Sequence, residues 1–403
     1  CLFKECCGKG HLTIVKWLYN VNIMRSCVQP PPEMIDSYTL AGIFERSCKQ
    51  GHLDVAKWLY SLNKTIYIRS AFQYSCALGF FTQAKWLYSL GNIGHTDIYY
   101  HNTFSMACRS GHIDIAKWLY SLPRNDIIDH NYHPCMSMHL YLVFKETCRA
   151  GYIQIAKWIY SLDIIRITAD NTDNYYLFRD CCEKGHIDIA KWLHSMLPTI
   201  DMYYFQWAFN FTCRSGHIDV AKWLYSIDNI ILEDENSDGE MEFACRMNCL
   251  AWQAFGYACE NNHIDVMKWL YSINDIDIHI CEEEVFRKAC KEGHIEIAKW
   301  LYSLGEINIH INDEYAFRLS CERGHLDIAK WIYSLGDVNI HIDNECAFIN
   351  CCTEGHFSIA KWLYSLGNID ICIDNHSAFR ESCINSHKYI YFSIITRYYI
   401  VLT

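Results

Sequence analysis

Apolar residues recur along this chain in an order that returns about every 31 positions. In one copy, Ile297, Trp300, Leu301 and Leu304 follow the i, i+3, i+4, i+7 spacing of a helix with one apolar face. Shortly before them, a phenylalanine and a cysteine stand four residues apart, which places both on one face of an earlier helix. The pattern therefore predicts a pair of short amphipathic helices in each copy.

The copies align on a tryptophan that stands ten residues after a cysteine, which itself stands four residues after a phenylalanine. These tryptophans are Trp17, Trp58, Trp86, Trp118, Trp158, Trp192, Trp223, Trp269, Trp300, Trp331 and Trp362. The period is a strict 31 residues in the last copies, whereas insertions lengthen several earlier ones. Two adjoining copies give the predicted core positions of the repeat, which are Phe286, Cys290, Gly293, His294, Trp300, Phe317, Cys321, Gly324 and Trp331.

The ends of the helices are also marked. A glycine follows the first helix in ten copies and Asn262 stands there in the other, as expected where the backbone turns with positive φ. A residue such as Glu296 opens the second helix, where an acidic group suits the positive end of the helix dipole. Between copies, residues 336–344 alternate apolar and polar side chains, which predicts a short extended finger.

These elements predict an all-α repeat solenoid, a stack of helix–turn–helix units with short extended fingers, because helices this short are stable only when stacked. We expect the array to cover residues 1–387, with about eleven full units, a partial twelfth, and insertions near 21–40, 123–140 and 229–250. Residues 388–403 are expected to form a degenerate C-terminal cap or tail, with a shifted reading frame or a truncated gene model as the alternative. Since residue 1 is Cys and not Met, we expect a fragment or an incomplete gene model.

The order of helix, Gly-His turn, second helix and finger resembles the ankyrin repeat. Residues 324–331, Gly-His-Leu-Asp-Ile-Ala-Lys-Trp, are similar to that family's Gly-His-Leu-Glu-Ile-Val-x-Leu segment, and the resemblance covers nearly the whole chain. The segment Ala-Lys-Trp-Leu-Tyr-Ser-Leu also resembles the ankyrin-type repeats of giant DNA viruses of amoebae. The family's Thr-Pro-Leu-His opening is absent and the unit is shorter than the usual length of about 33 residues, which leaves the shape of the finger open. The resemblance implies a stack that binds protein partners.

Charge and hydrophobicity restrict the partners and the location. The 403 residues include 46 acidic and 35 basic ones, and this excess of acid opposes binding to phosphate backbones, so we expect no nucleic acid partner. No apolar run approaches the roughly 20 residues that span a bilayer, so we expect no membrane partner. We expect a cytoplasmic monomer, in the host cell if the origin is viral, with its 23 cysteines reduced.

The sequence gives little indication of a catalytic or metal-binding site. One cysteine and one histidine per copy suggest zinc, but zinc needs four ligands at about 2.0–2.3 Å and neighbouring copies stack at about 8–10 Å, which favours packing. The tryptophans are candidates for stacking on bases, although their helical spacing beside leucine favours packing between copies. The strongest signals recur in every copy, unlike a single active site, and no hydrolase, metalloprotease or nucleotide-binding motif is present. We therefore expect no enzyme activity and no cofactor.

Two surfaces are candidates for binding a partner. Positions opposite the buried stripe of the first helix carry Arg46, Lys49, Arg109 and Arg149 against one acid, Glu146, which suggests a basic stripe for an acidic partner. An ordinary solvated face is the alternative. The second candidate is the row of fingers, represented by Asn308, His310 and Asn312.

The expected function is a non-catalytic protein–protein interaction scaffold. Two alternatives remain: the substrate-recruiting part of a larger enzyme or ubiquitin-ligase adaptor, and a pseudogene product without a current partner. The insertion at 229–250 carries six acidic residues and is expected to be a solvated spacer, with a binding loop as the alternative.

Overall fold

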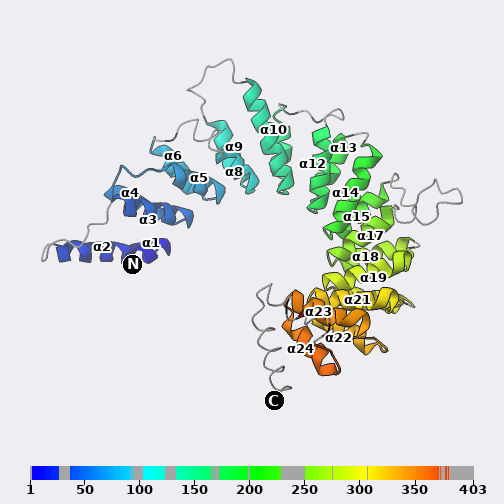
Figure 1. Cartoon of the computed structure of the whole chain (residues 1–403). Coiled ribbons are helices and arrows are strands. Elements are labelled where there is room, and N and C mark those ends of the chain that lie inside the picture. The colour runs from blue at the N-terminus through cyan, green and yellow to red at the C-terminus, as the bar shows by residue number, and fades with distance from the viewer. Residues whose placement is uncertain are drawn as a thin grey trace. The chain divides into compact units, whose positions relative to one another are not determined.

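The computed structural model describes residues 2–26, 37–91, 103–122, 133–163, 172–197, 200–227, 250–274, 276–305 and 307–371, together with a few single residues (Figure 1). Within these residues the regular secondary structure is helical and no strand occurs, which confirms the predicted all-α repeat solenoid. None of the described helices is both long and apolar enough to cross a membrane.

Each copy contributes a first and a second helix joined by a short turn. The first helices are α1 (Leu2–Gly8), α3 (Ser37–Lys49), α5 (Arg69–Ala77), α8 (Thr103–Arg109), α10 (His133–Arg149), α12 (Thr172–Glu183), α14 (Met202–Arg214), α17 (Leu250–Glu260), α19 (Ile280–Glu292), α21 (Ile311–Glu322) and α23 (Ile342–Thr353). The second helices are α2 (Leu12–Ser26), α4 (Leu53–Leu62), α6 (Phe81–Ser89), α9 (Ile113–Ser121), α11 (Ile153–Tyr160), α13 (Ile187–Met196), α15 (Ile218–Ser226), α18 (Ile264–Ile273), α20 (Ile295–Leu304), α22 (Leu326–Ser334) and α24 (Phe357–Leu366).

The expected insertions fall largely outside the described residues. The two ends of the insertion near 21–40 belong to α2 and α3. The insertion near 123–140 is described only from His133 onward, where it forms part of α10. All but the last residue of the insertion at 229–250, and the whole of the expected tail at 388–403, lie outside the described residues.

The chain divides into two compact units. Unit 1 comprises residues 1–177 and 191–198, and unit 2 comprises residues 178–190 and 199–403, so the division falls within α12 and α13. Within each unit the first helices of successive copies pack on one another, as α3 does on α5 and α19 does on α21. Within a unit, the second helices pack on the first helices of their own copies, as α22 does on α21.

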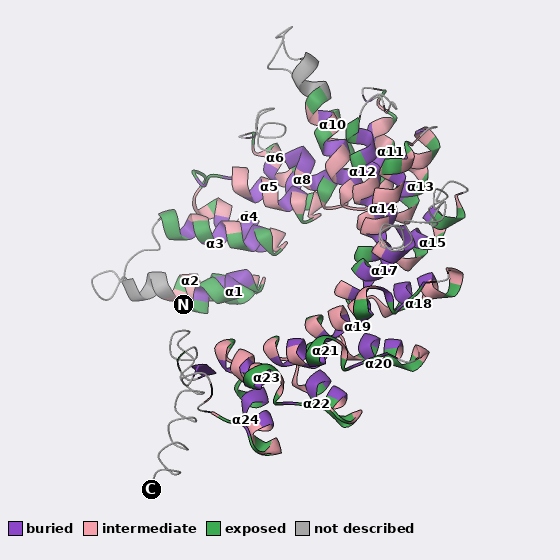
Figure 2. Cartoon of the chain, turned by 45° about the vertical axis from the view of Figure 1, so that its right-hand side comes forward, coloured by how far each residue is buried: buried purple, intermediate pink, exposed green. Residues whose placement is uncertain are grey.

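The phenylalanine and the cysteine of each first helix lie in the core, as predicted. Phe317, Cys290 and Cys321 are fully buried and Phe286 is 1% exposed. Figure 2 shows the buried residues along the sides on which the helices face one another. Each phenylalanine also contacts the tryptophan of the following copy, since the ring centroid of Phe286 lies 6.2 Å from that of Trp331. The core is therefore continuous from one copy to the next within a unit.

Nine of the repeat tryptophans also contact the tyrosine of the copy before them, in agreement with a packing role. The rings of Tyr302 and Trp331 lie 5.8 Å apart at an angle of 87°, an edge-to-face arrangement. Tyr120 and Trp158 in unit 1 repeat this contact at 5.7 Å and 89°. Aromatic pairs of this kind contribute about 0.5–1.5 kcal/mol beyond the burial of their area. Tryptophan and tyrosine thus join neighbouring copies as a recurring pair.

The Gly-His turn binds neighbouring copies together as well. Gly324 has a φ of +86°, and a Cβ atom there would lie 2.6 Å from Cε1 of His356 in the next copy, so only glycine fits. The ring of His325 reaches back to the preceding copy, where its Nε2 lies 2.9 Å from the carbonyl oxygen of Lys291. The positive φ predicted for these turns is confirmed, including at Asn262, where φ is +64°.

The fingers differ in part from the prediction. Ile307 and Ile309 are buried while Asn308 and His310 are exposed, so the alternation of apolar and polar residues is confirmed. The extended part is short, however, and the chain then passes through three successive residues with φ between +50° and +59°, at 312–314. The same left-handed turn recurs at 281–283 and 343–345. The alternation of apolar and polar residues indicates which side chains are buried, but it carries no information on the sign of φ. The sequence therefore did not reveal these turns.

Candidate partner-binding surface

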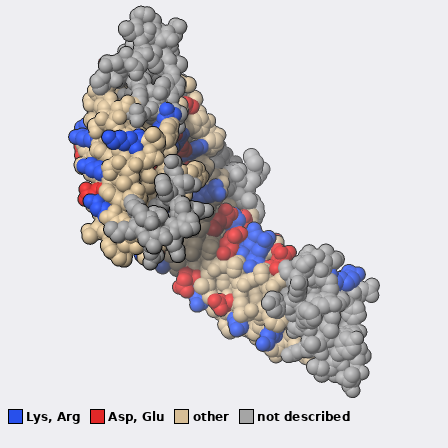
Figure 3. Space-filling view, turned by 90° about the vertical axis from the view of Figure 1, so that its left-hand side faces the viewer, with Lys and Arg blue, Asp and Glu red and all other residues tan. Residues whose placement is uncertain are grey.

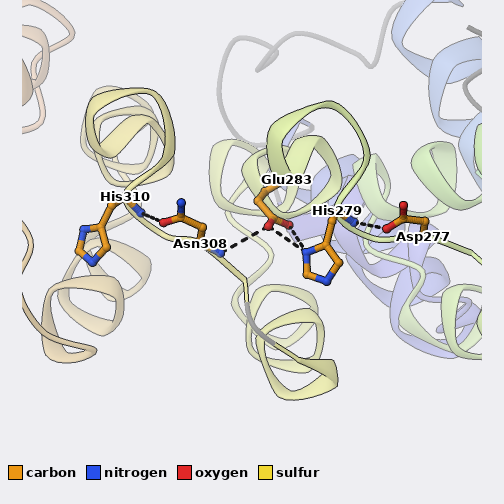
Figure 4. Close-up of polar contacts among 5 residues, drawn as sticks. All are labelled: Asp277, His279, Glu283, Asn308 and His310. Carbon is orange, nitrogen blue, oxygen red and sulfur yellow. Dashed lines mark hydrogen bonds and ion pairs between the residues drawn. The ribbon is translucent and has the colours of Figure 1, made fainter. Parts of the chain in front are cut away.

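The fingers of the last copies share one hydrogen-bonded arrangement, which Figure 4 shows around Glu283. A short polar side chain orders the start of each finger: Oδ1 of Asn308 accepts a hydrogen bond from the backbone N–H of His310 at 3.0 Å. Asp277 accepts one from His279 in the same way, at 2.9 Å. Asn and Asp favour such local turns because their side chains reach the backbone two residues ahead. The candidate residue Asn308 is therefore exposed and also orders its own finger.

A buried glutamate connects each finger with the next one. Nδ1 of His310 lies 2.8 Å from Oε1 of Glu314, a residue that is only 4% exposed. The same carboxylate oxygen accepts a hydrogen bond from the N–H of Asn339, in the following finger, at 3.4 Å. Figure 4 shows the equivalent contacts of Glu283 with His279 and Asn308. His310 thus has one ring nitrogen engaged, and its side chain remains 44% exposed.

Asn312 lies within the left-handed turn. Its Nδ2 donates a hydrogen bond to Glu282 of the preceding copy, and its carbonyl oxygen accepts one from Arg318 at 3.1 Å. The structure therefore brings Asn308, His310 and Asn312 together on one finger. All three make contacts within the chain, and all three are also exposed.

Sequence reasoning missed the glutamates Glu283, Glu314 and Glu345. Each is at most 5% exposed although it stands near the start of a first helix. The available signal was a motif of Asp or Asn, then His, then Glu, at residues 277, 279 and 283, which recurs twice at intervals of 31 residues. Glutamate near the start of a helix is usually exposed, so the motif gave no physical reason to expect its burial.

The residues of the basic stripe all lie in unit 1, on α3, α8 and α10. Arg46, Lys49 and Arg109 are exposed, and Arg149 is partly exposed. Lys49 lies 3.1 Å from Glu45 and 3.7 Å from the ring centroid of Tyr74. Nε of Arg109 lies 3.5 Å from Oε2 of Glu146. Neighbouring acids therefore neutralise part of the positive charge that the sequence suggested, and Figure 3 shows acidic residues (red) as well as basic ones (blue) on the face that it draws.

The repeat cysteines are poorly placed for reactions. Burial raises the pKa of Cys48 and of Cys259 to about 12, and it raises the pKa of Cys290 well above its ordinary value. Only the thiolate is a good nucleophile or metal ligand, so burial keeps these groups unreactive. The cysteines of the described residues are free thiols, most of them buried. Their environment is that of small apolar core residues.

Family models match the repeat over part of the chain. Residues 286–375 match the family model described as ankyrin repeats (3 copies), and residues 255–302 match one described as ankyrin repeats (many copies). Both matches lie in unit 2, and the same spacing of phenylalanine, cysteine and tryptophan recurs through unit 1. No curated protein matches the chain.

Proposed function

We propose that this chain, an ankyrin-repeat protein, is a non-catalytic scaffold that binds a protein partner on its exposed first-helix faces and finger tips. Ankyrin repeats are generally protein–protein interaction modules. One observation carries the proposal: the recurring Phe, Cys, Gly, His and Trp, of which Phe, Cys and Trp are present in every full copy, are used in contacts that hold the copies together. The exposed positions of the first helices vary from copy to copy. Some of them pair between copies, as Arg109 does with Glu146, but they remain exposed and are available for recognition.

Charge favours an acidic partner at unit 1. That unit contains 18 basic and 13 acidic residues, whereas unit 2 contains 17 basic and 33 acidic ones. A negatively charged protein is therefore attracted to unit 1 and repelled by unit 2. Arg46, Lys49, Arg109 and Arg149 would form part of the contact. Exposed charges of this kind mainly raise the association rate, and they add less to the affinity itself.

The fingers of unit 2 supply the second part of the proposed surface. Asn308, His310 and Asn312 are exposed on a backbone that the hydrogen bonds to Glu282, Arg318 and Glu314 hold in place. Such an ordered loop loses little conformational freedom when it binds a partner. We also propose that the protein acts in the cytoplasm, where its free thiols would remain reduced.

The test reverses the charge of the stripe by changing Arg46, Lys49, Arg109 and Arg149 to Glu. The matched control changes four exposed lysines of the same unit, Lys57, Lys64, Lys85 and Lys117, to Glu. Proteins captured from the cell of origin are quantified for each variant, and thermal stability is measured alongside. We expect the stripe variant to capture at least about tenfold less of a specific partner than the wild type, because four favourable charge contacts become repulsive. Its thermal stability should be unchanged. Equal capture by the stripe variant and the wild type would exclude the stripe and leave the fingers.

A further inference from the structure

The second helices carry a constant charge pattern on their exposed side. A lysine precedes the repeat tryptophan in all eleven copies, and in most copies an acidic residue stands three positions before that lysine. Four second helices of unit 2 carry both residues, and the eight side chains are all exposed: Asp219, Lys222, Asp265, Lys268, Glu296, Lys299, Asp327 and Lys330. The residues at exposed positions of the first helices differ between copies. Duplication of the repeat is therefore not enough to keep a surface residue the same in every copy.

In unit 2, stacking does not account for the constant lysine, whereas in unit 1 Nζ of Lys157 lies 5.9 Å from the ring centroid of Trp192 in the next copy. None of these eight side chains in the described part of unit 2 makes a hydrogen bond, an ion pair or a ring contact. Charged residues of the first helices behave differently, since Nζ of Lys288 lies 2.9 Å from Glu260 and 3.2 Å from Glu284. The acid and the lysine of one second helix therefore remain unpaired with each other although they are three residues apart.

Their positions on the helix define two rows. A separation of three residues places the lysine about 4.5 Å further along the helix axis and about 60° around it from the acid. Stacked helices repeat at about 8–10 Å, so the acids form one row and the lysines a second row beside it. In unit 2 the paired rows span α15, α18, α20 and α22, and Ser358 replaces the acid in α24.

A surface that neutralises both rows must carry the same two rows at the same spacing and in the opposite order. A second copy of the same face meets this condition when it is rotated by 180° about an axis parallel to the rows. The rotation places the acidic row of one chain opposite the lysine row of the other, and it leaves each repeat at the same position along the rows. Interfaces with twofold symmetry use one patch on both partners in this way. We propose that two copies of this chain associate through the second-helix faces of unit 2, with the acidic row of each against the lysine row of the other.

Two further features fit this association. Tyrosines lie next to the rows, and Tyr225, Tyr302 and Tyr333 are 37–39% exposed, which provides aromatic area of the kind enriched at protein interfaces. The net negative charge of unit 2, which repels other acidic proteins, also opposes this association, but a Debye length of about 8 Å at physiological ionic strength limits the repulsion to charges near the contact. This dimer replaces the monomer that the sequence alone favoured. It is independent of the proposed first-helix site, which uses another face.

Charge exchange between the rows tests the proposal. One variant carries Lys268→Glu, Lys299→Glu and Lys330→Glu, and the other carries Asp265→Lys, Glu296→Lys and Asp327→Lys. Sedimentation velocity at about 0.15 M salt measures the mass of each protein and of their equimolar mixture. We expect the wild type to reach twice the chain mass with rising concentration, each variant alone to remain a monomer, and the mixture to recover the dimer, because only the mixture places acid against lysine.

The control carries Lys4→Glu, Lys64→Glu and Arg214→Glu, which alters net charge as much as the lysine variant but at exposed positions off this face. It should dimerise as the wild type does, and circular dichroism should show the same helix content for all the proteins. A wild type that stays monomeric at every concentration overturns the proposal. Dimers of either row variant alone, or a mixture that stays monomeric, overturn it as well.

Discussion

At the scale of the residue, burial explains why cysteine and phenylalanine stand at the same two positions in every copy. Cys290 is fully buried, and burial also raises its pKa, so the side chain acts as a small apolar group. The sequence predicted this role because cysteine and phenylalanine at i and i+4 share one helix face. It did not predict the burial of Glu314, because that depends on contacts with His310 and with the next finger.

Replacing Cys290 with Ser should therefore destabilise the protein. A hydroxyl buried without a partner costs about 1–3 kcal/mol, and the side chain at this position is fully buried. Urea denaturation of the whole protein measures the change in the free energy of unfolding. The matched control is Cys346→Ser, at a partly exposed cysteine, where we expect a much smaller effect. Equal stability of the Cys290 variant and the wild type would contradict the burial of this stripe.

The two helices and the finger of each copy follow different rules at the scale of the element. Helix positions follow the 3.6-residue period, and the turns follow glycine, so both could be predicted from the sequence. The left-handed turns at 281–283, 312–314 and 343–345 could not. Non-glycine residues there cost about 1–2 kcal/mol each. At 312–314 they persist because Arg318 donates a hydrogen bond to the carbonyl oxygen of Asn312, and because the carboxylate of Glu314 contacts His310.

Removal of one such contact should loosen the finger. Glu314→Ala deprives His310 and the N–H of Asn339 of their acceptor, so we expect a loss of about 1–3 kcal/mol. Hydrogen exchange should show faster opening at 308–314 and in the following finger at 339–345. Glu354→Ala, at an exposed glutamate, serves as the control and should change neither. An unchanged exchange rate in the second finger would show that the glutamate does not connect the two.

Charge and titration act at the scale of the whole molecule. The net charge of −11 follows from composition alone, but the contrast between a basic unit 1 and an acidic unit 2 required the division of the chain that the structure shows. Pairing of Arg109 with Glu146 was equally hidden, because it joins residues 37 positions apart in neighbouring copies. Sequence periodicity identifies which positions are exposed, and contacts between copies decide how much charge each one presents.

Stability should be greatest between about pH 6.5 and pH 9. Desolvation lowers the pKa of His194, His217 and His263 below the ordinary 6.5, so the unfolded chain binds more protons just below that pH and stability falls as the pH falls. Burial raises the pKa of Cys48 and Cys259 from 9 to about 12, so stability also falls as the pH rises above 9. Melting temperatures across this range measure both limits. A melting temperature that rises from pH 6.5 to pH 5 would contradict the histidine contribution.

Site-specific photo-crosslinking tests the central claim, that a protein partner binds the exposed first-helix face, most directly. A photoreactive phenylalanine derivative is placed at Arg109, on α8, and in a second protein at Lys64, an exposed residue after α4. Both proteins are irradiated in extract from the cell of origin, and cross-linked products are identified. We predict a defined partner cross-linked from position 109 and absent from position 64. The same products from both positions, or a partner only from position 64, would contradict the account.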